Sequence, residues 1–368
     1  CSAVMAYVGI GTGLGIAFGQ GVSGFFGPKY GWRVPFLIVS IPALLVALLV
    51  ITTVVDPVRG GSEQSNCRNR STTANESVTD NSNPTTQDEG VHNFDSDPDL
   101  NRNDTPKKTC CASFISIFKL SAYSEHLKTT KNLFTSKTVI LILLQGAPGC
   151  IPWGVVNTFL NDYLSEDCGM SVQAATTVIL FFGLGNFFGM LLGGVGGDYL
   201  YKKDSRYPSL LSGSMAIFGC FPLWVMINTT NVGNGDDNDD GVPIGVMIRV
   251  GLIAVLAGIG SGCTGPIVKS TLQNVTLPNA RGQAFSWLNT FDDFGRGLGP
   301  VFVAMLIINL GGRQIAFNVG VGGWILCGIF NLCIFFTVRE DEEKARSAFH
   351  QRYSSSFQTS NPSSEPSA

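Results

Sequence analysis

Eight long apolar segments constrain this chain more than any other feature of its sequence. A helix needs about 20 mostly apolar residues to cross the hydrocarbon core of a bilayer. Only 14% of the residues are charged, against about 25% in an average soluble domain. The sequence therefore predicts an all-α membrane protein with eight transmembrane helices. The predicted spans are Ser2–Phe26, Val34–Val55, Val139–Leu160, Val172–Gly196, Leu210–Ile227, Pro243–Ile267, Phe285–Leu310 and Ile315–Val338.

The rest of the composition argues against several other classes of protein. The net charge of −3 is too small to indicate a nucleic-acid partner, and the sequence has no basic stripe. The three histidines, His92, His126 and His350, lie outside the predicted spans, so an intramembrane general base is missing and we expect no enzyme activity. The ten cysteines show no metal-binding spacing and no phosphate-binding loop is found, so we expect no metal and no other cofactor.

Two polar regions are predicted to lie outside the membrane. Residues 56–135 form a linker whose first part is rich in Ser, Thr, Asn and Asp and should be disordered. Within it, Ser113–Phe134 has apolar residues at helical spacing, which indicates either a helix on the membrane surface or an ordinary solvated linker helix. Cys110–Cys111 follow two lysines and are a candidate palmitoylation site. The Ser- and Pro-rich tail, residues 339–368, is also predicted to be disordered.

The distribution of Lys and Arg predicts the orientation in the membrane. The linker, the turns Tyr201–Pro208 and Leu277–Gly282, and the tail carry most of the basic residues, so these parts and both chain ends should face the cytoplasm. Arg249 and Lys269 lie near the two ends of one span and are interpreted as interfacial anchors. The outer sequon at Asn228 abuts the membrane, which argues against glycosylation there.

The arrangement of spans resembles the major facilitator superfamily. The chain has two predicted spans, a long linker and six further spans. The family has six spans, a linker and six spans, so the two arrangements agree if four spans are missing in front. Three local patterns carry the resemblance: the entry to a span at Gly31–Val50, the Gly-x-x-x-Asp plus basic signature at Gly193–Arg206, and the Pro-Asn-Ala-Arg-Gly turn within Leu277–Pro300. Within the superfamily the chain is most similar to Spinster-like carriers, which move lysolipids, sphingolipids or sugars.

The resemblance implies a domain organisation and a mechanism. Residues 1–55 would be the last two helices of the N-terminal six-helix bundle, and residues 136–338 the complete C-terminal bundle, so that eight of twelve transmembrane helices are present. The protein would be a secondary active transporter working by alternating access between two bundles. It would act on a small organic or lysolipid-like substrate among membrane lipids, and could be coupled to protons. A non-transporting receptor or scaffold derived from the same fold is the alternative.

The signature around Asp198 is a candidate latch between the two halves. A carboxylate at the membrane edge can accept hydrogen bonds from the backbone at the start of a facing helix, here Ser2–Phe26. Lys202, Lys203 and Arg206 follow it. The alternative is an interfacial charge cluster that only fixes topology.

Three glycines of the first span fall four residues apart, at Gly11, Gly15 and Gly19. This spacing places them on one helical face and predicts close packing against another helix. A mechanistic hinge is the alternative.

A proline-broken span supplies candidate cavity residues. Pro148 and Pro152 free backbone carbonyls, which a membrane tolerates only where they face protein or a water-filled cavity. Gln145, Trp153 and Asn157 recur around this break at nearly helical spacing. They either line the cavity or merely satisfy the kink.

Three charges lie within the span Phe285–Leu310. A span beginning after them, at Gly297, would be only about 21 Å long, whereas one beginning at Phe285 reaches about 39 Å. The charges therefore lie inside the membrane, where an ionisable residue indicates function by default. Asp292 and Arg296 are four apart and can form a structural ion pair, which leaves Asp293 as the stronger candidate for proton coupling. The face that carries the pair also carries the packing residues Gly295, Gly299 and Val303.

Overall fold

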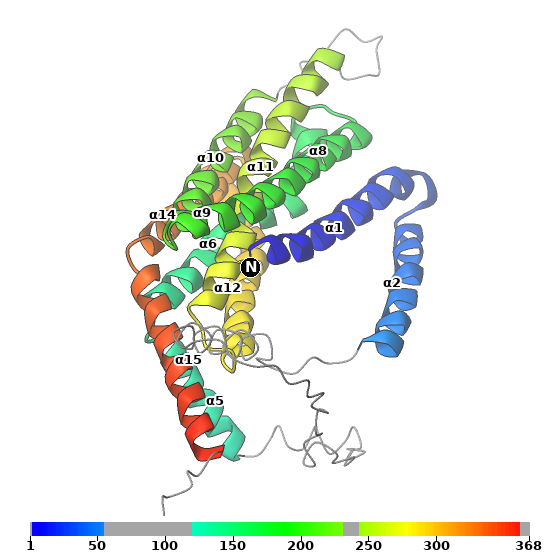
Figure 1. Ribbon diagram of the computed structural model, residues 1–368. Coiled ribbons are helices and arrows are strands. Elements are labelled where there is room, and N and C mark those ends of the chain that lie inside the picture. Colours follow the sequence, from blue (N-terminus) through cyan, green and yellow to red (C-terminus); the bar gives the residue numbers. More distant parts are fainter. Residues whose placement is uncertain (1, 55–119, 231–242, 361–368) are drawn as a thin grey trace, which may run out of the picture. The chain divides into compact units, whose positions relative to one another are not determined.

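The computed structural model describes residues 2–54, 120–230 and 243–360 (Figure 1). Contacts divide the chain into two units, one of Cys1–Val54 with Lys131–Ala368 and one of Val55–Thr130. The first unit carries every helix discussed below except most of α5. The helices are α1 Ser2–Tyr30, α2 Arg33–Thr53, α5 Leu120–Leu133, α6 Lys137–Thr158, α7 Leu160–Asp162, α8 Val172–Leu191, α9 Gly197–Lys203, α10 Tyr207–Thr229, α11 Ile244–Asn274, α12 Arg281–Leu310, α13 Arg313–Val321, α14 Gly323–Ile334 and α15 Val338–Ser360.

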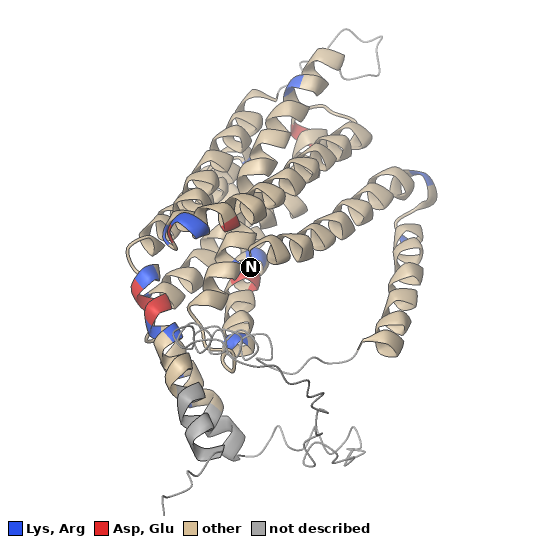
Figure 2. Ribbon diagram, viewed as in Figure 1, with Lys and Arg blue, Asp and Glu red and all other residues tan. Residues whose placement is uncertain are grey.

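The described residues contain eight helices long and apolar enough to cross a membrane, which confirms the predicted all-α membrane fold. Two spans are composite. The π-helical segment η3, Leu192–Gly196, joins α8 and α9 into one span over Val172–Lys203, and α13 and α14 together cover Arg313–Ile334. Figure 2 shows the Lys, Arg, Asp and Glu residues mainly near the helix ends and on α15, so the middle of most spans is apolar.

Local signals explain where several helices begin and end. Ser136 caps α6 by accepting a hydrogen bond from the backbone of Val139, and Ser171 caps α8 in the same way. Gly311 ends α12 in the left-handed conformation that glycine adopts without strain. The Nε of Arg281 donates to the carbonyl of Gln273, so the predicted Pro-Asn-Ala-Arg-Gly turn ties the end of α11 to the start of α12.

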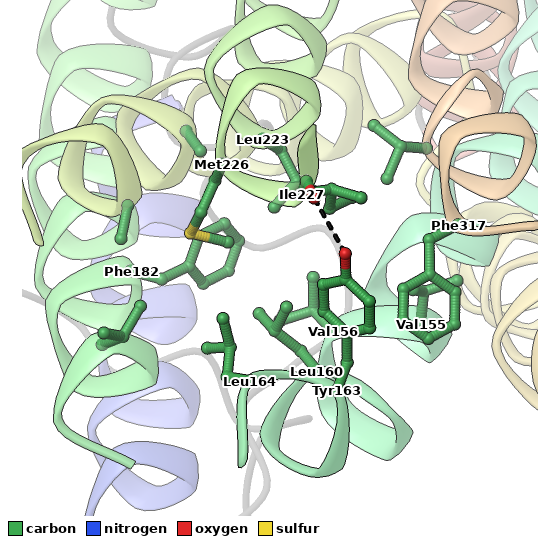
Figure 3. Packing of buried hydrophobic residues seen from close by; sticks show 14 of the residues in the cluster. Val155, Val156, Leu160, Tyr163, Leu164, Phe182, Leu223, Met226, Ile227 and Phe317 are labelled. Carbon is green, nitrogen blue, oxygen red and sulfur yellow. Dashed lines mark hydrogen bonds between the residues drawn. The ribbon is translucent and has the colours of Figure 1, made fainter. Parts of the chain in front are cut away.

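The larger hydrophobic core joins residues of α6, α8, α10, α11, α13 and α14 near one end of the bundle (Figure 3). Tyr163, in the π-helical segment η2 (Tyr163–Asp167), packs its ring against Phe317 with centroids 5.1 Å apart. Its hydroxyl donates to the carbonyl of Ile227 at 2.9 Å, which satisfies the buried phenol. Burial raises the pKa of Tyr163, so it remains a hydrogen-bond donor over the physiological range.

Helices α8 and α11 cross at close range. Glycines four residues apart on α8 and η3 meet backbone carbonyls four residues apart on α11. A Cβ added to any of these glycines would lie within 2.3 Å of a carbonyl oxygen, so only glycine allows this approach. The facing pairs are Gly185 with Val255, Gly189 with Ile259 and Gly193 with Cys263.

The predicted packing face of α1 meets no other helix in the described part of the chain. A Cβ added to Gly11, Gly15 or Gly19 would meet nothing within 4 Å in the described part of the chain. Instead α1 turns Gly13 and Gly24 towards α8, and a Cβ at Gly24 would lie 2.5 Å from the side chain of Thr176. Four-residue spacing shows that residues share a face, but it cannot show which face meets a partner.

The predicted packing glycines of α12 lie against α6. A Cβ added to Gly295 would lie 2.1 Å from the carbonyl oxygen of Ala147, and one added to Gly299 would lie 3.3 Å from the backbone of Ile151. The opposite face of α12 carries exposed apolar side chains, including Phe294, as expected of a surface that meets lipid.

The tail is helical where disorder was predicted. Residues 338–360 form α15, and residues 361–368 lie outside the described part of the chain. Opposite charges four residues apart support the helix, and Lys344 pairs with Glu340 at 2.6 Å. The hydrogen bond and charge of Lys344 hold the pKa of Glu340 below its usual range. The predicted surface helix at Ser113–Phe134 overlaps α5, while residues 113–119 and Cys110–Cys111 lie outside the described residues.

Candidate functional site

A cavity of about 290 Å³ lies between α1 and the helices that follow the linker. Gln145, Trp153 and Asn157, the three residues predicted around the α6 break, all line it. Trp153 stacks edge-on against Trp324 of α14, with ring centroids 6.3 Å apart, and Trp324 lines the same cavity. The cavity wall is therefore aromatic and polar on the α6 side.

Helix α14 packs against the proline break of α6. Pro152 removes the hydrogen-bond donor that the carbonyl of Pro148 would otherwise meet. Gly323 packs against that oxygen, since a Cβ there would lie only 2.4 Å from it. One residue further, the indole N–H of Trp324 donates to the carbonyl of Gly149 at 3.0 Å. The break thus positions α14 and orients an aromatic side chain at the cavity.

Gln145 belongs to a buried polar chain behind the cavity wall. Its Oε1 accepts hydrogen bonds from the thiol of Cys327 at 3.0 Å and from the amide of Asn331 at 3.3 Å. Asn331 in turn accepts from the hydroxyl of Ser212 at 3.2 Å. This chain connects α6, α14 and α10, so Gln145 both lines the cavity and helps to fix the bundle around it.

The charges of α12 are arranged differently from the prediction. Asp293, not Asp292, forms the ion pair within the helix, with Oδ1 3.3 Å from Nη1 of Arg296. Asp292 and Arg296 line the cavity, whereas Asp293 is not among its lining residues. Asp292 lies on the stripe of α12 that packs on α6, and Gly146 leaves room for its carboxylate. Spacings of three and four residues both allow an ion pair on a helix, so the spacing alone does not decide which aspartate pairs with Arg296.

The candidate latch residue Asp198 lies against the first turn of α1. Its Oδ1 accepts the backbone N–H of Ser2 at 2.9 Å, and its Oδ2 that of Ala3 at 3.1 Å. The contact places a negative charge at the N-terminal end of the α1 dipole, which is electrostatically favourable. It joins the segment before the linker to the span that carries the Gly-x-x-x-Asp signature.

The basic residues of the signature lie elsewhere. Lys203 lies over the ring of Tyr199, with 4.7 Å between Nζ and the ring centroid, and Lys202 is exposed. Arg206 lies over Phe335 at 5.8 Å. The structure brings α1 and Asp198 together, but it places these three cations along the end of α9 and the following turn.

A second polar contact joins α1 to α6 at the far side of the cavity. The side-chain amide of Gln20 donates to Oδ1 of Asn157 at 3.4 Å. Between the two contacts, Gly9, Thr12 and Gly13 of α1 line the cavity. Helix α1 thus forms one wall and is held to the opposite helices at its first turn and again at Gln20.

Comparison with protein families matches residues 2–300 to the Major Facilitator Superfamily. The chain belongs to this superfamily. None of the curated proteins compared with the chain matches it significantly. Membership of the superfamily shows that the protein is a multi-pass membrane transporter with a small-molecule substrate. This conclusion agrees with the helical bundle and the cavity described above.

Lys269 and Asn186 are among the polar residues of the cavity that were not predicted from the sequence. Lys269, interpreted as an interfacial anchor, lines the cavity wall. Asn186 on α8 also lines it, is only 6% exposed, and has a buried Oδ1 with no hydrogen-bond partner among the described residues. A single asparagine within a run of apolar residues was the available signal, because an amide at membrane depth requires a polar neighbour or a cavity.

A second cavity of about 280 Å³ adjoins the first. It lies between α1 and α8 and is lined almost entirely by apolar side chains, among them Leu184 and Phe187. Three residues line both cavities: Gly13, Asn186 and Met190. A polar and an apolar space therefore share one wall in this member of the superfamily.

Proposed function

We propose that this protein is a secondary active transporter that works by alternating access, with the polar cavity as its substrate site. The observation that carries the proposal is the placement of α1. It forms one wall of the cavity, and polar contacts hold it to the helices after the linker at Asp198 and at Asn157. Breaking either contact would open one end of the cavity, which is the geometry that alternating access needs.

We propose that the transport is coupled to protons through Asp292. A carboxylate that lines a cavity at membrane depth is a candidate proton carrier. Arg296 and Lys269 line the same cavity, so the charge of Asp292 responds to both cations and to any charged substrate. Asp293 is less suitable, because its side chain is 70% exposed and paired with Arg296.

We propose a lysolipid-like substrate, in keeping with the Spinster-like sequence character. The polar cavity offers charged and amide groups for a head group, and the apolar cavity offers space for a hydrocarbon chain. Because Asn186 and Met190 border both, a single amphiphile could occupy the two spaces together. A small organic substrate would use the polar cavity alone.

We propose the orientation that the basic residues favour. The Asp198 contact, Lys202, Lys203 and Arg206 would lie at the cytoplasmic face, together with the linker, the chain ends and α15. The Gln20–Asn157 contact would then close the external side.

The proposal is tested by substrate flux into liposomes that contain the complete natural protein. Lysolipids of several chain lengths and small sugars are offered with and without an inwardly acidic pH gradient. We expect saturable uptake of one class, altered by the gradient. Substitution of Trp153 by Ala should weaken it, and substitution of the lipid-facing Phe294 by Ala serves as the control. No uptake of any class by folded protein would favour the receptor or scaffold alternative.

A further inference from the structure

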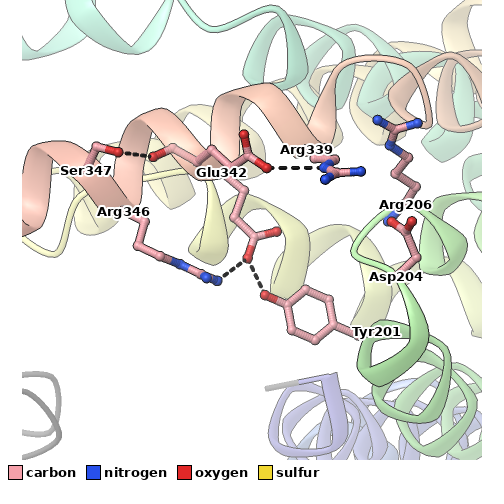
Figure 4. Close-up of polar contacts among 8 residues, drawn as sticks. Tyr201, Asp204, Arg206, Arg339, Glu342, Arg346 and Ser347 are labelled. Carbon is pink, nitrogen blue, oxygen red and sulfur yellow. Dashed lines mark hydrogen bonds and ion pairs between the residues drawn. The ribbon is translucent and has the colours of Figure 1, made fainter. Parts of the chain in front are cut away.

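Helix α9 is held from two sides by residues one helical turn apart. Asp198 accepts the backbone N–H groups at the start of α1. Tyr201, three residues later, donates its hydroxyl to Oε1 of Glu342 on α15 (Figure 4). The same short helix therefore connects the contact with α1 to the helix at the end of the chain.

The segment before α9 allows it to change direction. The π-helical segment η3 separates α9 from α8. Such segments are points where a helix bends. Gly193 is wedged against α11, and Gly197, the first residue of α9, packs against Ile267 of α11. The packing on α11 up to Gly197 is thus a fixed base, and the position of the rest of α9 depends on what holds it beyond that base.

Helix α15 is attached to the bundle by two adjacent acids. Asp341 accepts from the hydroxyl of Ser136 at 2.7 Å and from the backbone of Thr138 at 2.8 Å, at the start of α6. Glu342 binds Tyr201 and, at 3.0 Å, Arg346 of its own helix. Both acids are nearly buried, at 8% and 7% exposure.

The Glu342 attachment is suited to reversible docking. Both donors of this carboxylate bind Oε1, while the buried Oε2 has no hydrogen-bond partner among the described residues. A buried carboxylate oxygen without a donor is unfavourable, so docking depends strongly on the hydrogen bond from Tyr201. Loss of that bond would release α15 from α9 while Asp341 could still hold it to α6.

We propose that α15 is a regulatory strap that sets the position of α9 and thereby stabilises the Asp198 contact with α1. When Glu342 binds Tyr201, α9 is held where Asp198 meets Ser2 and Ala3, and the cavity is closed at this end. When α15 undocks, α9 is free to turn at η3 and the contact with α1 weakens. This regulation rests on the proposed role of the Asp198 contact in the transport cycle.

A cross-link between α1 and α11 reports the closed contact directly. The hydroxyls of Ser2 and Ser270 lie 2.9 Å apart and are buried, so cysteines at both positions would bring two sulfur atoms within reach of a disulfide. Cleavage at a protease site inserted in the linker separates α1 and α11 into two fragments. A cross-link between the helices then keeps the two fragments together on a gel. The single variants Ser2→Cys and Ser270→Cys measure any cross-link to native cysteines. The assay uses the complete natural protein in membranes and needs no substrate.

Tyr201→Phe is the decisive variant, because it removes one hydroxyl and retains the ring. A hydrogen bond to a charged group corresponds to about a tenfold change in an equilibrium, so we expect about tenfold slower cross-linking. Glu342→Gln should slow it in the same direction. Tyr199→Phe, on the same helix and 59% exposed, should leave the rate unchanged.

The outcomes separate this proposal from the proposed function. Elution as a single folded species is required of each variant, and Glu342→Gln replaces Tyr201→Phe if the latter does not fold. An unchanged cross-linking rate in folded Tyr201→Phe and Glu342→Gln proteins would overturn the strap, even if liposome flux is observed. Slower cross-linking would support the strap, whether or not a substrate has been found.

Discussion

The carboxylate of Asp293 lies 3.3 Å from the guanidinium of Arg296, one turn further along α12. The pair is more than half exposed on both sides, with side-chain exposures of 70% and 53%. Asp292, its neighbour in sequence, instead lines the cavity. Two adjacent aspartates on one helix therefore occupy different environments, and they provide a matched pair for testing proton coupling.

The first prediction concerns the pH dependence of flux. Asp292→Asn should abolish the response to a pH gradient, because Asn cannot carry a proton. With one proton per substrate, a gradient of one pH unit supports at most about tenfold accumulation, and the variant should show none. Asp293→Asn should retain accumulation, since it removes only an exposed ion pair. Accumulation by Asp292→Asn liposomes equal to that of the parent would end this assignment.

The second prediction concerns the crossing of α8 and α11. Gly189→Ala should destabilise the protein by about 1–3 kcal/mol, because the added methyl would lie 2.3 Å from the carbonyl oxygen of Ile259. Gly15→Ala should be neutral, since nothing described lies within 4 Å of its added methyl. The midpoint temperature of the detergent-solubilised protein measures both. Equal midpoints for the two variants would contradict the crossing.

The spans could be predicted from the sequence because the bilayer fixes the length of apolar helix that it needs. The same physics placed the α12 charges inside the membrane. The sequence could not show in this way which face of a helix packs against its neighbours. Gly11, Gly15 and Gly19 show the regular spacing of a packing face, yet the contacts of α1 pass through Gly13 and Gly24. A helical wheel defines faces, and only the arrangement of the other helices decides which face is covered.

The tail and the cavity show where contacts distant in sequence decide the structure. Residues 339–360 are polar enough to suggest disorder, but Asp341 and Glu342 meet Thr138 and Tyr201, which are far away in the chain. Asn186 gave only a weak signal, because its position beside the cavity depends on α1 and α11. Local sequence patterns contain no information about such partners.

The third prediction concerns access to the cavity. Asp198→Ala should open the end of the cavity that we propose to be cytoplasmic, because it removes the acceptor of two backbone N–H groups of α1. We expect about tenfold faster alkylation of the cavity-lining Cys150 by an impermeant maleimide from that side. Labelling is located by mass spectrometry.

Asp204→Ala is the control for this change. It removes a carboxylate from the same region, but the hydrogen bond of Asp204 is local, to the backbone of Arg206. Its labelling rate should match the parent. If Asp198→Ala and Asp204→Ala label equally, the Asp198 contact does not close the cavity.

The fourth prediction concerns the apolar cavity and the chain of the substrate. Burial of one methylene is worth ~0.8 kcal/mol, or about fourfold in affinity, so binding of lysolipids should strengthen with chain length. Leu184→Trp should remove this dependence, because Leu184 lines the apolar cavity and a larger ring would fill it. Leu144→Trp is the control, since Leu144 has the same 46% exposure and does not line either cavity. Competition between lysolipids of different chain length for uptake measures the effect. An unchanged dependence in folded Leu184→Trp protein would place the hydrocarbon chain elsewhere and leave the polar cavity as the site of the head group alone.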